Sequence, residues 1–303
     1  MIKMILALLL CFNIANADAY RYELAIGAIF QDEEPYLREW IEFHKLVGAT
    51  HFYLYNNCSA DGYLSVLKPY IDAGEVDLID WPIPAMSWNE WIHEVQPAAY
   101  VNCIKHAKGK AKWLALIDID EFLTPISGTS VPEILKDYEE FAGVCFNWKT
   151  FGHSWLFDQP ADQLMIESLI LTAPHDRATN LGVKSIVRPE FVEGCKHPHY
   201  VIYKEGYYNV NSDKVRDIDV NGATARVHYD RLAVNHYWSR TGSNLYKKLK
   251  RYSLWFPEIV PERWIEYVMG MNEVPDSTME RFIAPLREKM GLAPYRKEVF
   301  DWQ

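Results

Sequence analysis

The stretch Trp113-Leu-Ala-Leu-Ile-Asp118-Ile-Asp120-Glu121-Phe122 is the most informative part of the sequence, because an apolar run leads directly into three carboxylates. The run predicts a buried strand, and side chains alternate along an extended chain, so we expect Asp118 and Asp120 on the same side. Ligands of α/β proteins bind at the carboxyl ends of parallel strands. Two carboxylates this close repel each other, which favours a divalent cation shared with a bound diphosphate. The alternative interpretation is a helix cap followed by an exposed acidic turn.

The residues before this stretch alternate between strand and helix patterns. Strand-like runs at 24–30, 51–55, 76–81 and 113–117 are separated by helix-like runs at 35–47, 64–71 and 97–107. This rhythm predicts parallel βαβ units and a mostly parallel, Rossmann-like nucleotide-binding sheet. The rhythm breaks after residue 125, where strands are predicted at 144–148, 183–187, 199–203 and 225–229, and helices at 132–138, 244–254 and 277–290. Because no linker rich in Gly or Ser interrupts the chain, we expect one large α/β domain.

Composition excludes several classes of protein. The 303 residues are 49% hydrophobic and 24% charged, which is ordinary for a chain with a sizeable core and excludes disorder. The formal net charge of −10 argues against a partner that is a nucleic acid, because such proteins are basic overall. A local site for a phosphorylated small molecule is compatible with this charge. Aromatic residues reach 14%, and their flat faces fill cores and also stack on sugar rings and bases.

Residues 1–19 have the pattern of a signal peptide. Lys3 precedes a nine-residue apolar run at 4–12, and small residues follow at Ala15, Ala17 and Ala19. We therefore expect export, or entry into a secretory lumen, rather than a cytoplasmic location; an uncleaved anchor or a buried strand is the alternative. The apolar run is shorter than the about 20 residues of a transmembrane helix. No other segment is long and apolar enough to span a membrane.

The cysteines beyond residue 19 give no metal or redox motif. They are scattered, and none forms a Cys-x-x-Cys pair. Either disulfides that form after export or small buried hydrophobic residues explain them.

Polar turns follow the first two predicted strands. Asp32 follows the first, where it can cap the next helix and also face a pocket. Asn57 and Asp61 follow the second, where an amide and a carboxylate can hydrogen-bond a nucleoside. A plain capped turn explains both segments equally well.

Basic residues gather late in the chain. The segment 240–251 holds five basic residues and no acidic one, and Lys184 and Arg188 flank a predicted strand. These cations could neutralise phosphate oxygens, although a solvated helix face is the plainer interpretation. His236 follows an apolar pair, and imidazole is a plausible third metal ligand beside two carboxylates; a lone histidine is more often structural.

Taken in order, these motifs resemble glycosyltransferase family 92 and its bacterial relatives among the family-2-like glycosyltransferases. The resemblance covers about residues 24–251. The matching segments are 31–44 with Gly48, 55–62, Gln96 with 100–103, 118–122, 151–154, 183–189 and 235–237. It implies a GT-A fold, with a nucleotide-sugar-binding half at 24–124 and an acceptor-binding half with the C-terminal helices at 125–303, all within a domain of residues 20–303.

The resemblance also implies a chemistry. A sugar would pass from a nucleotide diphosphate-sugar to an acceptor, with Mn²⁺ (or Mg²⁺) held at the Asp-x-Asp motif. By position, Asp118 would face the ribose or the metal, and Asp120 would bind the metal. His236 would be the third metal ligand, and Asp32 and Asp61 would line the nucleotide pocket. The family suggests a UDP-sugar donor, with galactose and an inverting outcome, and a glycan or another acceptor.

The acceptor side is the least defined by the sequence. An inverting enzyme needs a base for the acceptor hydroxyl, and Asp158 and Glu193 are weak candidates. Relatives often carry a second glycine near residue 155, where this chain has Trp155 and Leu156.

Two other functions are compatible with parts of the pattern. A sugar nucleotidyltransferase would need a Gly-rich phosphate loop after the first strand, but segment 30–34 is acidic and has no glycine. A non-catalytic carbohydrate-binding protein would use the many aromatic residues, but it would not need Asp118, Asp120 and a basic cluster together.

Overall fold

Strand β1 (Tyr22–Phe30) is buried on both faces of the central sheet. Leu24 and Ile26 pack into one hydrophobic core, and Ala25 and Ile29 into the other. Residue 27 lies on the second face and must be a glycine there. Helix α4 (Gln96–Ala107) approaches so closely that a Cβ at this position would overlap the Cys103 thiol. The computed structural model describes residues 20–255 and 261–295. The predicted signal peptide at 1–19 lies outside the described residues.

The central sheet has a parallel half and a mixed half. Strands β3 (Val76–Asp80), β2 (His51–Asn56), β1 and β4 (Ala111–Leu116) are neighbours in that order, and all of them are parallel. The predicted βαβ units are therefore confirmed. Beyond β4 the order continues with β8 (Val183–Val187), β6 (Gly143–Thr150), β12 (Leu232–His236) and β5 (Glu121–Pro125). Here β8 is antiparallel to both neighbours, β6 and β12 are parallel, and β5 is antiparallel to β12.

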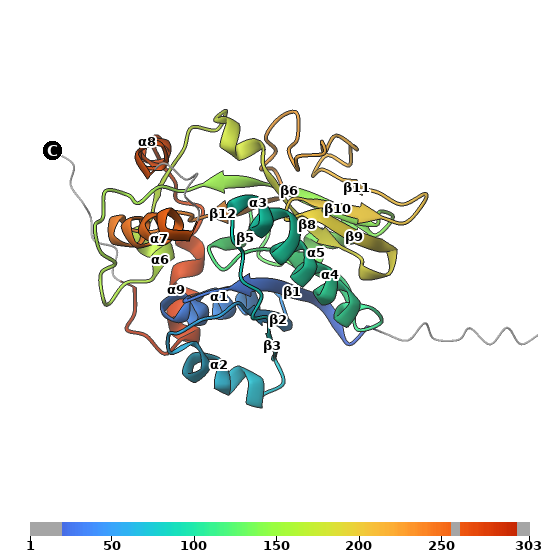
Figure 1. Cartoon of the computed structure of the whole chain (residues 1–303), viewed down its shortest axis with the longest axis horizontal. Helices are drawn as coiled ribbons and strands as arrows, with labels where there is room; N and C mark the ends of the chain where they lie inside the picture. Colours follow the sequence, from blue (N-terminus) through green and yellow to red (C-terminus); the bar gives the residue numbers. More distant parts are fainter. Residues whose placement is uncertain (1–19, 256–260, 296–303) are drawn as a thin grey trace, which may run out of the picture.

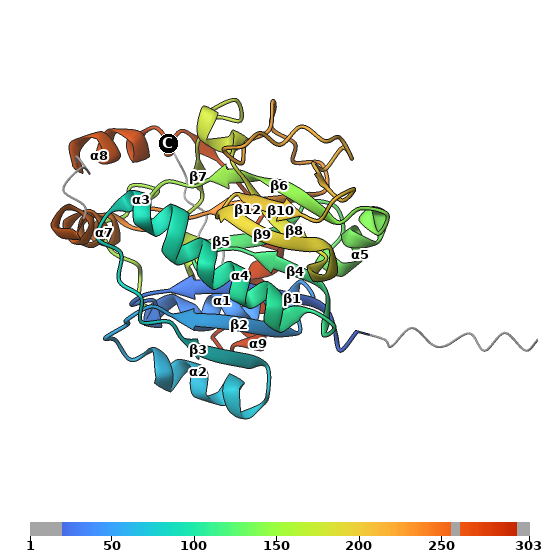
Figure 2. The same ribbon diagram turned by 45° about the vertical axis from the view of Figure 1, so that its right-hand side comes forward.

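Helices cover the two faces of the parallel half (Figures 1 and 2). Helices α1 (Glu34–Leu46), α2 (Tyr63–Asp72) and α9 (Glu280–Lys289) contribute to the larger core, while α4 covers the opposite face. Helices α7 (Gly242–Trp255) and α8 (Pro261–Met269) lie together at the end of the molecule away from β10 (Tyr200–Tyr203). No helix within 20–255 or 261–295 is long and apolar enough to cross a membrane.

The short elements lie mainly in the connections. They are α3 (Trp88–Glu90), the π-helical turn η1 (Trp91–Val95), α5 (Val131–Leu135), η2 (Lys136–Tyr138), α6 (Met165–Ser168), β7 (Leu171–Thr172), η3 (Ala178–Leu181), η4 (Pro189–Phe191), β9 (Val192–His197), β11 (Asn209–Val210) and β13 (Val274–Pro275).

Some sequence predictions are wrong. Residues 225–229 form no strand, because the backbone there bonds to side chains instead, as in His228 N–H donating to Asn147 Oδ1 at 3.1 Å. Helix α1 has Glu33, not Asp32, at its N-cap position. The sequence patterns also missed β5, β9, β12 and α8.

The acidic segment after β4 is a turn, not an extended chain. The strand ends at Leu116, and Glu121 N–H donates to the Asp118 carbonyl at 3.1 Å across the turn. The prediction that Asp118 and Asp120 share one side of a strand is therefore wrong, and their positions depend on this turn.

Candidate active site

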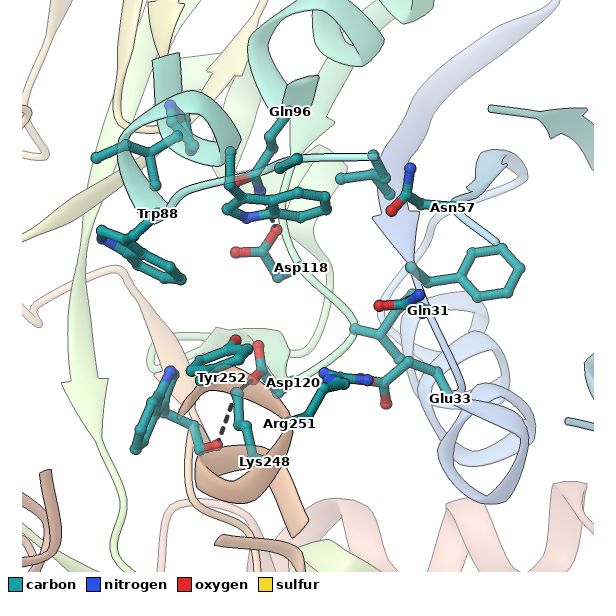
Figure 3. Close-up of a pocket in the computed structure, with 18 of the residues that line it drawn as sticks. Gln31, Glu33, Asn57, Trp88, Gln96, Asp118, Asp120, Lys248, Arg251 and Tyr252 are labelled. Atoms are coloured by element: carbon teal, nitrogen blue, oxygen red, sulfur yellow. Dashed lines mark hydrogen bonds and ion pairs between the residues drawn. The ribbon is translucent and has the colours of Figure 1, made fainter. Parts of the chain in front are cut away.

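A cleft of about 600 Å³ opens at the carboxyl ends of β1, β2 and β4 (Figure 3). This volume is typical of a small-molecule site. Its polar lining includes Gln31, Glu33, Asn57, Gln96, Asp118, Asp120, His199, His236, Lys248 and Arg251. Its aromatic lining includes Trp88, Trp91, Trp148, Trp238, Tyr252, Trp264 and Tyr267.

The Asp118 carboxylate is fixed by three side chains from two other elements. Its Oδ1 accepts hydrogen bonds from Gln96 Nε2 at 2.7 Å and from the Tyr100 hydroxyl at 2.9 Å, both on α4. Its Oδ2 lies 2.7 Å from Nζ of Lys184 on β8. These bonds hold the carboxylate in one orientation, and Figure 3 shows Asp118 beside Gln96 in the cleft.

Lys184 is a buried counter-ion and does not line the cleft. Its side chain is 1% exposed, and Nζ lies 3.3 Å from Oε2 of Glu121, which is fully buried. Burial alone would lower the pKa of Lys184, but the nearby Asp118 and Glu121 carboxylates raise it. Lys184 therefore stays charged and neutralises the acidic turn, instead of contacting the donor as the sequence suggested.

Glu121, which follows the Asp-x-Asp motif, stabilises the acidic turn through hydrogen bonds that its buried side chain accepts. Its Oε2 accepts the Asp118 N–H at 2.9 Å, and its Oε1 accepts the Trp148 indole N–H at 2.7 Å. Burial raises the pKa of Glu121, and the adjacent Lys184 opposes this effect. Glu121 thus links the turn to β6, where Trp148 forms one wall of the cleft.

Asp120 and His236 come together at the centre of the cleft. Asp120 Oδ1 lies 3.6 Å from His236 Nε2, because β12 places His236 opposite Glu121 in the register with β5. Burial lowers the pKa of His236 to about 4, so the ring is neutral and can act as a ligand. Burial raises the pKa of Asp120, but the neighbouring cations, of which Lys248 has the largest effect, outweigh it and the net change is a lowering.

This donor set fits a divalent cation. A carboxylate oxygen and a neutral imidazole nitrogen 3.6 Å apart can both reach one ion at roughly 2.1 Å each. The Asp118 carboxylate is bound to Gln96, Tyr100 and Lys184, and it does not form a compact cluster of ligand atoms with Asp120 and His236. Within the described parts of the chain, such a compact cluster of three ligand atoms is formed by Asp213, His228 and Asp230, far along the chain.

The nucleoside-side predictions separate into two groups. Asn57 lines the cleft, where its Nδ2 donates to the carbonyls of Trp81 at 2.8 Å and Ile83 at 2.9 Å. Asp32 and Asp61 lie just outside the lining. Asp32 accepts the Ala60 N–H at 2.8 Å, and Asp61 accepts the Glu34 N–H at 2.8 Å. Both carboxylates therefore tie the turns after β1 and β2 together.

Three other predicted site residues lie away from the cleft. Arg188 donates to the Glu139 carbonyl at 2.8 Å and sits over the Phe191 ring. The two candidate bases, Asp158 and Glu193, are exposed and do not line the cleft.

Several residues in the cleft or next to it were missed as site residues by sequence reasoning. Gln96 and Tyr100 carried part of the family resemblance, but nothing in the local pattern gave them a role. Glu33 forms an ion pair with Arg240 at 2.6 Å. Trp148 and His199 are distant in the sequence and come into contact only in the folded structure.

The cysteines of the described chain form no disulfide. Cys103 and Cys145 are buried, Cys195 is half-buried, and Cys58 is exposed. The explanation as small buried residues thus holds for two of the four described cysteines, and Cys58 departs from it.

The sequence is similar to that of known proteins, in some cases over most of its length. The family model described as Glycosyltransferase family 92 matches residues 21–280. A glycosyltransferase family 92 protein of Ricinus communis is 24% identical over 245 residues, which cover 76% of this chain and 39% of that protein. The galactan beta-1,4-galactosyltransferase GALS3 of Arabidopsis thaliana is 32% identical over 111 residues, 35% of this chain and 22% of that protein.

The chain thus spans about two-fifths of the length of the family 92 relatives it matches. Among solved structures, residues 1–349 of S. aureus TarS in complex with UDP-GlcNAc match with a TM-score of 0.37 and 12% identity, covering 88% of this chain and 72% of that TarS chain. The single α/β domain, with its parallel half and mixed extension, is the GT-A type of fold that the resemblance implied. Because the family model covers most of its length, the chain belongs to glycosyltransferase family 92.

Proposed function

We propose that this chain is a metal-dependent glycosyltransferase that moves a hexose from a UDP-sugar to a glycan acceptor with inversion. The observation that carries the proposal is the Asp120–His236 pair at 3.6 Å, located in a cleft at the carboxyl ends of parallel strands. A binding protein for free glycans has no use for a buried carboxylate–imidazole pair with an ammonium beside it.

Each residue has a role in this scheme. Asp120 and His236 hold Mn²⁺ or Mg²⁺, and the bound ion supplies positive charge to the diphosphate leaving group. Asp118, oriented by Gln96 and Lys184, faces the ribose. Lys248, 3.0 Å from Asp120, provides a second positive charge beside the diphosphate. Asn57 and Gln31 border the nucleoside end of the cleft.

Galactose is the proposed sugar because two relatives are named galactan beta-1,4-galactosyltransferases. A single hydroxyl contact can separate one hexose from another, so the donor needs direct measurement. Location in an exported or secretory compartment also remains a proposal, and N-terminal sequencing of the mature protein tests it.

The test is release of UDP from UDP-galactose, UDP-glucose and UDP-GlcNAc, with β-1,4-galactotetraose as acceptor, with and without Mn²⁺. We expect Mn²⁺-dependent UDP release that falls at least about 100-fold in Asp120→Asn, because the metal loses its charged ligand. Asp72→Asn, an exposed carboxylate on α2, is the matched control and keeps full activity. If no donor is turned over while the free tetrasaccharide binds, the carbohydrate-binding alternative replaces this proposal.

A further inference from the structure

The cleft contains no carboxylate free to act as a base among its described lining residues. Its acids are Glu33, Asp118 and Asp120, and each is ion-paired: Glu33 to Arg240 at 2.6 Å, Asp118 to Lys184 at 2.7 Å and Asp120 to Lys248 at 3.0 Å. Deprotonation of an acceptor hydroxyl therefore needs another group in this cleft.

His199 offers a lone pair whose position is fixed by the backbone. Its Nδ1 lies 3.0 Å from the Val183 carbonyl oxygen, and a carbonyl only accepts, so Nδ1 carries the hydrogen. Nε2 is therefore the unprotonated nitrogen, and it makes no hydrogen bond within the described chain. The residue is half-buried and lines the cleft, which leaves Nε2 available to a ligand.

The turn that carries His199 is pinned at two further points. Just before the turn, Nε2 of His197, the last residue of β9, lies 2.8 Å from the Val220 carbonyl. Gly222, with φ +73°, packs so tightly on His199 that any Cβ there would overlap the His199 side chain. The Val183 N–H donates to the Gly222 carbonyl at 3.1 Å, which joins both supports of the imidazole. The ring is thus positioned by three separate segments.

Trp148 contacts both His199 and His236, one of the proposed metal ligands. Trp148 meets His199 edge to face at a centroid distance of 4.7 Å, and the same indole also packs against His236 at 4.5 Å. The Trp148 indole is fixed by its hydrogen bond to Glu121. Gly182 makes room for this arrangement, because a Cβ there would lie 2.6 Å from the Trp148 ring.

From this placement we propose that Nε2 of His199 is the catalytic base of the transfer reaction. The acceptor oxygen forms the new bond to the anomeric carbon while its proton passes to Nε2. The bond from that carbon to the diphosphate oxygen breaks, and UDP leaves with the electron pair. The imidazolium then returns its proton to solvent. The assignment rests on the proposed function of the cleft.

Charged and titratable neighbours keep the ring neutral before reaction. Those facing it are Lys184 of β8, His197 of β9 and His236 of β12. Burial, followed by the positive charge of Lys184, holds the pKa of His199 well below its usual value. The acidic limb of the turnover profile should therefore lie below pH 6.5 and depend on this residue.

The test compares His199→Ala and His199→Gln with wild type in the UDP-sugar assay described above. Loss of a positioned base costs about 10²- to 10⁴-fold, so we expect kcat to fall at least 100-fold in both variants. The Kd of UDP with Mn²⁺ should change less than threefold, and added imidazole should restore part of the activity of His199→Ala. His106→Ala removes an exposed imidazole and is the control.

The outcomes separate the two proposals. A wild-type protein that releases UDP from no donor overturns the proposed function, and the base with it. An active wild type with a His199→Ala variant within threefold of its kcat overturns the base alone. Loss of UDP binding in the His199 variants would assign this residue a structural role and overturn the base. The same conclusion follows if activity is lost because the variants unfold, with no rescue of His199→Ala by imidazole and no folded His199→Gln variant.

Discussion

Lys248 Nζ lies 3.0 Å from Asp120 Oδ2, although 128 residues separate the two along the chain. The ammonium also donates to the Trp238 carbonyl at 2.9 Å and sits 4.5 Å from the centre of the Trp238 ring. The lysine thus occupies the free side of the carboxylate whose other oxygen faces His236.

A metal ion at Asp120 must compete with this ammonium. Lys248→Met should tighten Mn²⁺ binding about fivefold, equivalent to about 1 kcal/mol, and lower kcat of UDP release about tenfold because the diphosphate loses a cation. Titration calorimetry with Mn²⁺ checks the first effect. Lys247→Met, at an exposed neighbouring position, should change neither. An unchanged Mn²⁺ affinity in Lys248→Met would contradict the competition.

Lys184 should be essential to the stability of the acidic turn. Lys184→Met leaves Asp118 and the fully buried Glu121 without their cation, and breaking a buried ion pair costs about 3 kcal/mol or more. Urea unfolding measures this loss. Adding Asp118→Asn to Lys184→Met should restore at least about 1 kcal/mol, because it removes an uncompensated charge while Oδ1 still accepts from Gln96 and Tyr100. If the double variant is less stable than the single one, the loss does not come from charge.

Gly182 should be needed for packing against Trp148, not for an unusual backbone conformation. In Gly182→Ala the new methyl group meets the Trp148 ring, and overpacking of this kind costs about 1–3 kcal/mol. We expect a lower Tm and a changed tryptophan emission as the indole leaves Glu121. Gly194→Ala is the matched control, since the nearest atom to its Cβ would be at 3.9 Å. Equal Tm values for the two variants would show that Trp148 can move without cost.

Acid should destabilise the protein through His44. This ring is fully buried, donates from Nδ1 to the Trp40 carbonyl at 2.8 Å and accepts the Leu123 N–H at 3.1 Å on Nε2. Burial lowers the pKa of His44 to about 3, whereas the unfolded chain binds the proton near pH 6.5. The unfolded state therefore gains more protons as the pH falls from 6.5 towards 3, and His44 lowers the free energy of unfolding by about 1.4 kcal/mol per pH unit.

Denaturant unfolding at pH 7, 6 and 5 checks this slope. His44→Phe removes the titrating group from an aromatic environment and should flatten the pH dependence. His106→Phe, at an exposed site, should leave it as in wild type. A slope that is the same in His44→Phe and in wild type would assign the acid sensitivity to other groups.

The sequence by itself determined the parallel half of the sheet and the position of the acidic turn. Continuous apolar runs such as β1 and β4 predict strands that are buried on both faces of a sheet. The helices between these strands are each followed by a glycine and form parallel crossover connections. Chain order then places the residues after β1, β2 and β4 at one edge, so Asn57, Asp118 and Asp120 could be assigned to one cleft.

Only the tertiary structure decided the partners of those residues. The antiparallel insertion of β8 beside β4 brings Lys184 to Asp118, and the pairing of β12 with β5 brings His236 to Asp120. Local patterns record burial and periodicity, but these contacts depend on which distant strands are neighbours. For the same reason the sequence pattern suggested Lys184 as a phosphate ligand and did not identify His199 as a site residue. The surroundings of both residues depend on how the strands beyond β4 are arranged.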